Sequence, residues 1–384
     1  MARLAMTEML QTRLTEKLGC RYPIVQTAMG WVADPKLVAA SCNAGGFGFL
    51  AGATIPPREM ERDLLRVKEL TDQPFGVNFH MYQPNAAEIV AMVIRHGVRA
   101  VSYSRSPGPE FIRKLKDAGV VCMPTVGLPK HAIKAVELGA DVVTVQGGEG
   151  GGHTGSVPTT LLIPQVIDAV GDKVPVVAAG GFKDGRGLVA ALAWGADGIA
   201  MGTRFLMTAE SPVPRATLQR YVDCQNPGDI IVSRAMDGLP QRMIMNELLS
   251  ELERAGTLRK LWIALRNGLA FRAHTGASVL DLLRTAMAMG RDDEMTSSQA
   301  IMSANAPMII QKAMVEGEPA RGVLPSGQVA GVIDDLPSCD QLIRAIVTEA
   351  EQRLQALARR AGTEQIPVGS NSFDQKYTPG NQVD

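Results

Sequence analysis

A single histidine inside a run of glycines is the strongest candidate for chemistry in this chain. Residues 142–146 are mostly apolar and rich in β-branched types, which predicts a strand. The strand leads into Gly147-Gly148-Glu149-Gly150-Gly151-Gly152-His153-Thr154-Gly155. Glycine lets the backbone take positive φ and approach a ligand closely, and an imidazole exchanges a proton near neutral pH. We therefore interpret this stretch as an active-site loop in which His153 takes a proton from a carbon acid or supplies one.

The same loop contains two features with competing interpretations. Glu149 is the carboxylate nearest to His153 in sequence, and it either orients the imidazole or is a solvated loop charge. The spacing Gly150-x-Gly152-x-x-Gly155 formally matches the dinucleotide fingerprint. It follows the sixth strand of a series, however, and Pro158 comes soon after. We therefore discount a Rossmann dinucleotide site.

Eight similar strand candidates recur along the chain, and the glycine loop follows the sixth. Each is nearly all apolar, as strands buried on both faces are, and helical stretches separate them. The strands are predicted at 23–29, 46–51, 75–80, 100–104, 120–126, 142–146, 174–180 and 198–202. The helices are predicted at 36–43, 58–70, 86–96, 109–118, 130–138, 160–170 and 185–194, with Gly97, Gly119, Gly139 and Gly195 as C-terminal caps. Helices between strands imply parallel pairing, so the pattern predicts an α/β fold, a (β/α)8 TIM barrel, with an open doubly wound sheet as the competitor.

Strands seven and eight each end in a glycine-containing turn. Gly180-Gly181 follows the seventh strand and Gly202-Thr203 the eighth. In many barrels the exposed backbone amides at this pair of loops form a phosphate site. The alternative interpretation is that both are only tight turns between a strand and a helix. A cofactor with one phosphate fits better than a dinucleotide, and FMN is the natural candidate. Asn78 and Gln146 can then hydrogen-bond the edge of its ring.

After Arg204 the alternation of strand and helix ends. We expect a barrel over residues 1–222 and a mainly helical substrate-binding or lid extension over 223–319. A returning segment and a closing helix on the barrel should follow over 320–362, with a flexible tail over 363–384.

Composition narrows the classes of partner. Lys plus Arg and Asp plus Glu both number 39, so there is no electrostatic footprint for nucleic acid or for an acidic membrane. No apolar run reaches the roughly 18 residues of a membrane span. The 5 cysteines and 5 histidines are scattered without metal-ligand spacing, and residues 1–19 do not have the apolar h-region expected of a signal peptide. We expect a soluble cytoplasmic protein with reduced thiols, no metal and a small-molecule substrate.

Several of these motifs together resemble the nitronate monooxygenase (2-nitropropane dioxygenase-like) family over roughly residues 14–357. They are Pro23-Ile24-Val25-Gln26-x-x-Met29, Phe75-Gly76-Val77-Asn78, Gln146-Gly147-x-Glu149-x-Gly151-Gly152-His153, Ala179-Gly180-Gly181 and Gly198-x-x-Met201-Gly202-Thr203. The resemblance implies non-covalent FMN and a catalytic base for nitroalkanes at His153. It implies flavin contacts at Gln26, Ala28, Met29, Asn78, Gln146, Gly151, Gly180, Gly181, Gly202, Thr203 and, on the returning segment, Gln328.

Two departures from the family pattern indicate one branch of it. Thr27-Ala28-Met29 stands where members often have A-P-M, and Glu149-Gly150-Gly151 stands where E-A-G is common. The most similar branch is the one with NADH-dependent flavin reductases that act on CoA thioesters in bacterial steroid ring C/D degradation. The resemblance to it lies in Val25-Gln26-Thr27-x-Met29-Gly30-Trp31, Gly147-Gly148-Glu149-Gly150-Gly151-Gly152-His153-Thr154-Gly155 and Gly327-Gln328-Val329-Ala330-Gly331.

Two oxidoreductase functions are therefore open. One is oxidation of alkyl nitronates or nitroalkanes with O2. The other is NAD(P)H-dependent reduction of a double bond in an acyl-CoA, with a quinone or enoyl-thioester reductase as its variants, and with NADH or NADPH as donor. A non-redox isomerase or lyase that holds its substrate's phosphate, and a non-catalytic binding protein, are the competing classes. A homodimer is the candidate assembly.

Overall fold

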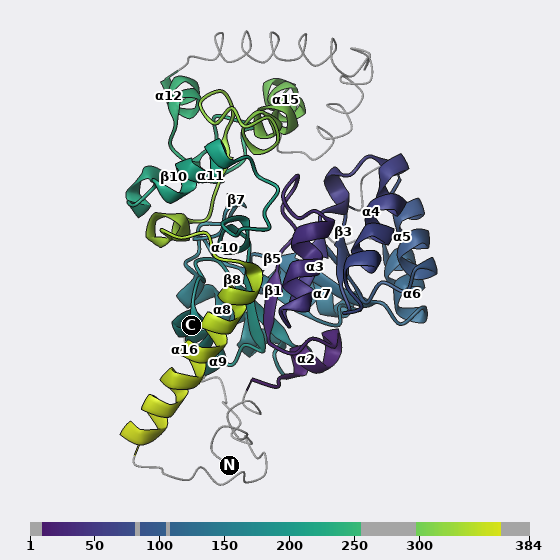
Figure 1. The fold of residues 1–384 in the computed structure, drawn as a ribbon. Coiled ribbons are helices and arrows are strands. Elements are labelled where there is room, and N and C mark those ends of the chain that lie inside the picture. Colours follow the sequence, from purple (N-terminus) through teal and green to yellow (C-terminus); the bar gives the residue numbers. More distant parts are fainter. Residues whose placement is uncertain (1–9, 81–84, 105–107, 255–296, 362–384) are drawn as a thin grey trace, which may run out of the picture.

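Eight parallel strands close into a barrel in the computed structural model, which describes residues 10–80, 85–104, 108–254 and 297–361 (Figure 1). The order around the barrel is β1-β2-β3-β4-β5-β6-β8-β9, and β1 pairs with β9 to close it. The strands are β1 (Ile24–Gln26), β2 (Phe47–Leu50), β3 (Gly76–Asn78), β4 (Ala100–Ser104), β5 (Val121–Val126), β6 (Val143–Gln146), β8 (Val176–Ala179) and β9 (Gly198–Met201). The predicted TIM barrel is confirmed, and each strand lies within the run predicted for it.

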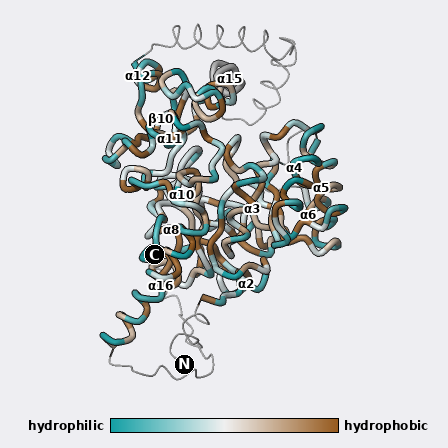
Figure 2. The backbone as a smooth tube through the Cα atoms, in the orientation of Figure 1, coloured by the Kyte–Doolittle hydropathy of each residue, from teal (hydrophilic) through white to brown (hydrophobic). Residues whose placement is uncertain are grey.

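Both faces of the barrel wall are buried, which is why the strands are apolar almost throughout. Val25, Phe47 and Val177 belong to the cluster that fills the interior. Their chain neighbours Ile24 and Val176 pack outward against the helices, as the two-residue period of a strand requires. In Figure 2 the hydrophobic residues gather in the barrel region and the hydrophilic ones lie mainly along its outer helices.

A helix follows each of the first seven barrel strands, close to its predicted bounds. They are α3 (Pro35–Asn43), α4 (Pro57–Leu70), α5 (Ala86–Arg95), α6 (Pro109–Asp117), α7 (Pro129–Glu137), α8 (Thr159–Val170) and α9 (Gly185–Ala193), while α2 (Arg13–Leu18) precedes β1 and η1 (Gly52–Thr54) follows β2. The expected glycine caps are confirmed: φ is 62° at Gly97, 73° at Gly119, 102° at Gly139 and 95° at Gly195. This left-handed geometry ends each helix and turns the chain into the next strand.

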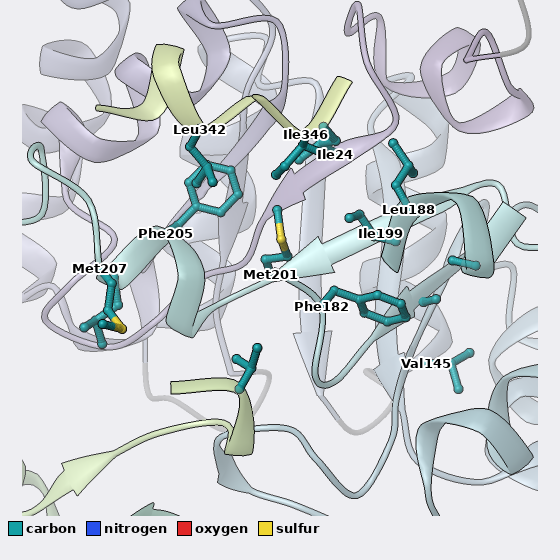
Figure 3. Close-up of a cluster of buried hydrophobic side chains, with 14 of the residues drawn as sticks. Ile24, Val145, Phe182, Leu188, Ile199, Met201, Phe205, Met207, Leu342 and Ile346 are labelled. Atoms are coloured by element: carbon teal, nitrogen blue, oxygen red, sulfur yellow. The ribbon is translucent and has the colours of Figure 1, made fainter. Parts of the chain in front are cut away.

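The eighth helix of the barrel comes from the far end of the chain. The helix directly after β9, α10 (Thr203–Leu206), has a single turn, and α16 (Cys339–Arg360) packs between α9 and α3. Figure 3 shows Leu342 and Ile346 of α16 beside Phe205 and Ile24. Backbone contact with α9 requires glycine at 185, because a Cβ there would lie 2.5 Å from Ala350 N and Ile346 O. The predicted closing helix is thus part of the barrel wall.

Between α10 and α16 the chain builds an added unit above the carboxyl ends of the strands (Figure 1). Its elements are α11 (Arg215–Val222), η2 (Pro227–Asp229), β10 (Ile230–Ser233), β11 (Gln241–Ile244), α12 (Glu247–Arg254), α15 (Ser297–Met314), β12 (Leu324–Pro325) and η3 (Gln328–Val332). Strands β10, β11 and β12 form an antiparallel sheet, which β7 (Gly152–His153) joins. The expectation of a mainly helical extension missed this sheet. Residues 255–296 of the extension and the predicted tail at 363–384 lie outside the described residues.

Two further findings concern the described chain as a whole. Within it, no helix is long and apolar enough to cross a membrane. All five cysteines are buried with free thiols. Burial raises the pKa of Cys42 and of Cys339 to about 12, so neither supplies a thiolate nucleophile at neutral pH.

Candidate active site

His153 lies on a two-residue strand, β7, that the glycine loop forms as it leaves the barrel. Strand β7 pairs antiparallel with β11, with Gln241 opposite His153. Gly152 has a φ of 66°, a left-handed conformation that favours glycine. The His153 side chain is 59% exposed. Its backbone is therefore held by a sheet while its imidazole remains open to a small molecule.

A buried carboxylate and a buried amide hold the His153 ring. His153 Nε2 is 2.9 Å from Asp237 Oδ2 and 3.0 Å from Gln241 Nε2. The Gln241 amide also donates to Asp237, and Leu239 N donates to Asp237 Oδ1 at 3.0 Å. Asp237 is 4% exposed and Gln241 3%. This arrangement fixes one edge of the imidazole and leaves the other edge outward.

Neither Asp237 nor Gln241 is among the site residues predicted from the sequence. They lie 84 and 88 residues after His153, in a stretch expected to be helical. Strands as short as β7 and β11 have no periodicity that could indicate their pairing. The only available signal was the turn-forming Asp237-Gly238 step between two apolar runs.

Glu149 does not contact His153 in the structure. Its carboxylate accepts hydrogen bonds from Thr159 N at 2.9 Å and from the Thr159 hydroxyl, at the N-terminus of α8. Its backbone oxygen accepts from Gln328 N at 2.9 Å. A carboxylate at this position satisfies free backbone amides and complements the helix dipole. Glu149 is thus a cap that anchors the glycine loop, and Asp237 is the carboxylate beside the imidazole.

Polar side chains from β3, β4 and β6 line the carboxyl end of the barrel. Asn78 on β3 donates from Nδ2 to the backbone oxygen and the hydroxyl of Ser102 on β4, both at 3.1 Å. Gln146 on β6 donates from Nε2 to His153 O at 3.0 Å. Val77 and Val145 are fully buried against the outer helices, so the alternating neighbours Asn78 and Gln146 face the barrel interior. Two of the predicted ring-binding side chains therefore share one face.

The two glycine turns after β8 and β9 lie side by side, because Ala179 pairs with Ala200. Gly180 and Gly181 have φ values of 105° and 81°. No side chain caps the start of α10 at Thr203, whereas Asp184 caps α9 and Glu149 caps α8. The turn before α10 therefore offers backbone amides to an anion without a capping carboxylate of its own.

Comparison with known proteins assigns the family. The nitronate monooxygenase profile matches residues 11–349. The chain belongs to the nitronate monooxygenase family. It is 50% identical over 348 residues to the (3aS,4S,5R,7aS)-5-hydroxy-7a-methyl-1-oxo-octahydro-1H-indene-4-carboxyl-CoA dehydrogenase of Rhodococcus jostii, covering 91% of this chain and 98% of that one. It is 32% identical to a probable nitronate monooxygenase of Staphylococcus saprophyticus, over 63% of this chain and 81% of that one. The structure of FabK from Thermotoga maritima is similar with a TM-score of 0.73 and 30% identity, covering 91% of this chain and 99% of that one.

Family membership decides between the open classes. The named relatives are a monooxygenase and a dehydrogenase, both oxidoreductases. The chain is therefore an oxidoreductase of the nitronate monooxygenase family, and the non-redox and non-catalytic alternatives are set aside. Both oxidoreductase functions named above are consistent with these relatives.

Three expected flavin contacts lie on or just after β1, in different surroundings. The Gln26 side chain is fully buried and donates to Thr27 O and Phe49 O. Its Oε1 lies within the wall, near the position that a Cβ on Gly48 would occupy. Ala28 packs on the barrel interior, and Met29 Sδ lies 3.5 Å from the Cβ position of Gly202. Ala28 and Met29 thus lie near the mouth, whereas the Gln26 side chain does not.

The other two expected contacts, Gly151 and Gln328, lie where the returning segment crosses the glycine loop. A Cβ on Gly151 would be 2.5 Å from Gly327 N. Gly327 N donates to Thr203 Oγ1 at 2.8 Å. The returning segment thus links the loop to the glycine turn after β9. Strand β11 also contacts the loop, because Arg242 donates to Gly148 O at 2.9 Å, and burial lowers the pKa of this guanidinium.

Metal ligation has no candidate in the described parts of the chain, where no cluster of three His, Cys, Asp or Glu side chains could hold an ion.

We predict that Glu149→Ala lowers stability rather than removing a catalytic group. Loss of the cap and of its charge should cost about 1–2 kcal/mol, lower the Tm and speed hydrogen exchange at the first turn of α8. Glu137→Ala is the matched control, because Glu137 pairs only with an exposed lysine and is itself 59% exposed. Unchanged stability together with lost turnover would instead assign a chemical role to Glu149.

Proposed function

We propose that the chain binds FMN non-covalently and acts as a dehydrogenase on a bicyclic acyl-CoA. Gly180, Gly181, Gly202 and Thr203 would hold the phosphate, and Ala28, Asn78 and Gln146 would contact the ring. The paired glycine turns fit this group, because Gly181 is exposed and has positive φ. When bound, FMN supplies the transfer of hydride equivalents that amino-acid side chains cannot perform.

His153 acts as the acid–base group of the reaction. A carbon next to a thioester carbonyl is a carbon acid, as is the carbon of a nitroalkane, and both lose a proton to a neutral base. The exposed edge of the His153 ring is available for that proton, and Asp237 and Gln241 keep the ring in place. General-base catalysis of this kind requires a fixed base within hydrogen-bond reach of the proton.

The observation that carries the choice of substrate is the 50% identity to the Rhodococcus dehydrogenase over 98% of its length. We infer that the substrate is a CoA thioester of a hydroxylated, methylated indene skeleton, or a compound close to it. NAD+ or NADP+ would take the electrons, and NADH or NADPH would drive the reverse reaction. A small-molecule substrate and a homodimer remain the expected partner and assembly.

Oxidation of nitronates by O2 is the second candidate. The observations in its favour are the family match over residues 11–349 and the 32% identity to a probable nitronate monooxygenase. The same base would serve this reaction, so only redox partners and substrates separate the two functions.

The first test of function follows the flavin under anaerobic conditions. We expect an indene-carboxyl-CoA with a 5-hydroxyl group, and NADH, to bleach the flavin absorbance faster than the nitronate of 2-nitropropane. Fast bleaching by the nitronate alone would replace the dehydrogenase proposal with the monooxygenase. A panel with a quinone and an unsaturated straight-chain acyl-CoA then distinguishes the quinone and enoyl-thioester reductase variants.

A second test separates charge from bulk at the phosphate turn. Asp and Asn are similar in size and both tolerate positive φ, and a Cβ on Gly181 makes only an ordinary 3.4 Å contact with Glu149. We expect Gly181→Asp to bind FMN at least about tenfold more weakly than Gly181→Asn, a difference of about 1.4 kcal/mol. The Tm of the flavin-free forms controls for repulsion from Glu149. Equal FMN affinity in the two variants would place the phosphate elsewhere.

A third test concerns the base. His153→Ala should keep the flavin spectrum and lose about 10²–10⁴-fold in turnover, because the glycine turns belong to other strands. His131→Ala is the control, since His131 lies exposed on α7. Loss of flavin together with activity would make His153 a structural residue.

A further inference from the structure

The added unit supplies the two side chains that contact the His153 ring. The β10–β11 connection carries Asp237, and β11 carries Gln241, opposite His153 in the pairing. Both side chains are almost fully buried. A carboxylate that is 4% exposed needs hydrogen-bond donors. Leu239 N and the Gln241 amide supply two, and His153 Nε2 lies at the distance of a third.

The donors and acceptors around Nε2 favour one tautomer. Nε2 lies near Asp237 Oδ2, which is an acceptor, and near Gln241 Nε2, which is a donor. If Nε2 carries hydrogen, the ring and the Gln241 amide both donate to Asp237. If Nε2 is bare, its lone pair faces the carboxylate at 2.9 Å, which is repulsive. The Gln241 amide cannot adopt the opposite orientation without placing its oxygen against the same carboxylate.

We propose that Asp237 and Gln241 are positioning residues that hold the hydrogen on His153 Nε2, so that Nδ1 is the atom that exchanges a proton with the substrate. Nδ1 has no hydrogen-bond partner among the described residues, and the side chain is 59% exposed. When Nδ1 gains a proton, the ring becomes a cation that faces the Asp237 carboxylate. A carboxylate behind a catalytic imidazole stabilises that cation and fixes the ring. The proposal rests on the catalytic role proposed for His153.

The decisive measurement is the tautomer of His153 in the purified holoprotein. Nitrogen-15 NMR of histidine-labelled protein distinguishes Nε2–H from Nδ1–H, and the signal missing from His153→Ala identifies residue 153. We expect Nε2–H in the wild type and a shift towards Nδ1–H in Asp237→Asn, whose amide can donate to a bare Nε2. Asp229→Asn, a carboxylate change just before β10, should leave the signal unchanged. Nδ1–H in the wild type would overturn the proposal even if Asp237→Asn fails to fold.

Kinetics then separates positioning from a general structural role. Asp237→Asn should lower kcat by about 10²-fold or more, with KM changed much less, because general-base catalysis contributes about 10²–10⁴-fold. In a His153→Ala background the same change should have little further effect on kcat, since the two residues act as a unit. Additive losses would overturn the proposal. The NMR result does not depend on any substrate, so failure of the acyl-CoA assay and failure of this proposal are distinguishable.

Discussion

The pairing of β7 with β11 is the contact on which the rest of the site depends. It consists of two residues on each strand, with Gln241 opposite His153 and Arg242 opposite Gly152. A loop with glycine at 150, 151 and 152 has a large conformational entropy, and ordering it for catalysis is costly. Incorporating Gly152 and His153 into a sheet fixes the backbone of the base. The barrel therefore provides the loop, while the added unit determines where the imidazole lies.

The glycines of this loop are explained mainly by packing against protein atoms. A Cβ on Gly147 would lie 2.1 Å from Thr159 Oγ1, and one on Gly150 would lie 2.5 Å from Gln146 Nε2. A Cβ on Gly151 would likewise lie 2.5 Å from Gly327 N. Because these glycines have no side chain, α8, β6 and the returning segment can pack directly against the loop. By contrast, the exposed Gly181 has room for a Cβ, and its glycine requirement comes from positive φ. Glycines that look alike in sequence thus have different physical causes, which are close packing at Gly147, Gly150 and Gly151 and positive φ with room for a Cβ at Gly152 and Gly181.

The barrel could be predicted from sequence, because each of its strands is a local apolar run between a helix cap and a helix start. The strand assignments also predicted the candidate residues at the strand ends, because parallel strands place their carboxyl ends together. These residues are Asn78, Gln146 and Gly180. The added sheet could not be predicted in this way. Its strands have two to four residues, and its pairing joins positions 153 and 241. Asp237 was missed for the same reason: its proximity to His153 is a product of that long-range pairing and not of sequence spacing. Glu149 illustrates the converse, because closeness in sequence made a contact with His153 one of two open interpretations, whereas its carboxylate accepts from Thr159 in the structure.

The groups of the site that the family shares do not by themselves determine the substrate. Glycine turns after β8 and β9 are suited to a phosphate, and His153 is suited to a carbon acid, whether a nitroalkane or a thioester. None of these groups distinguishes a small nitro compound from a bulky CoA thioester. Discrimination therefore has to come from residues around them, where the whole-chain similarity carries information that the motifs lack. The alignment with the indene-carboxyl-CoA dehydrogenase extends over 348 residues at 50% identity, against 290 residues at 32% for the nitronate monooxygenase. Substrate preference in this chain is thus better inferred from the surroundings of the base than from the base itself.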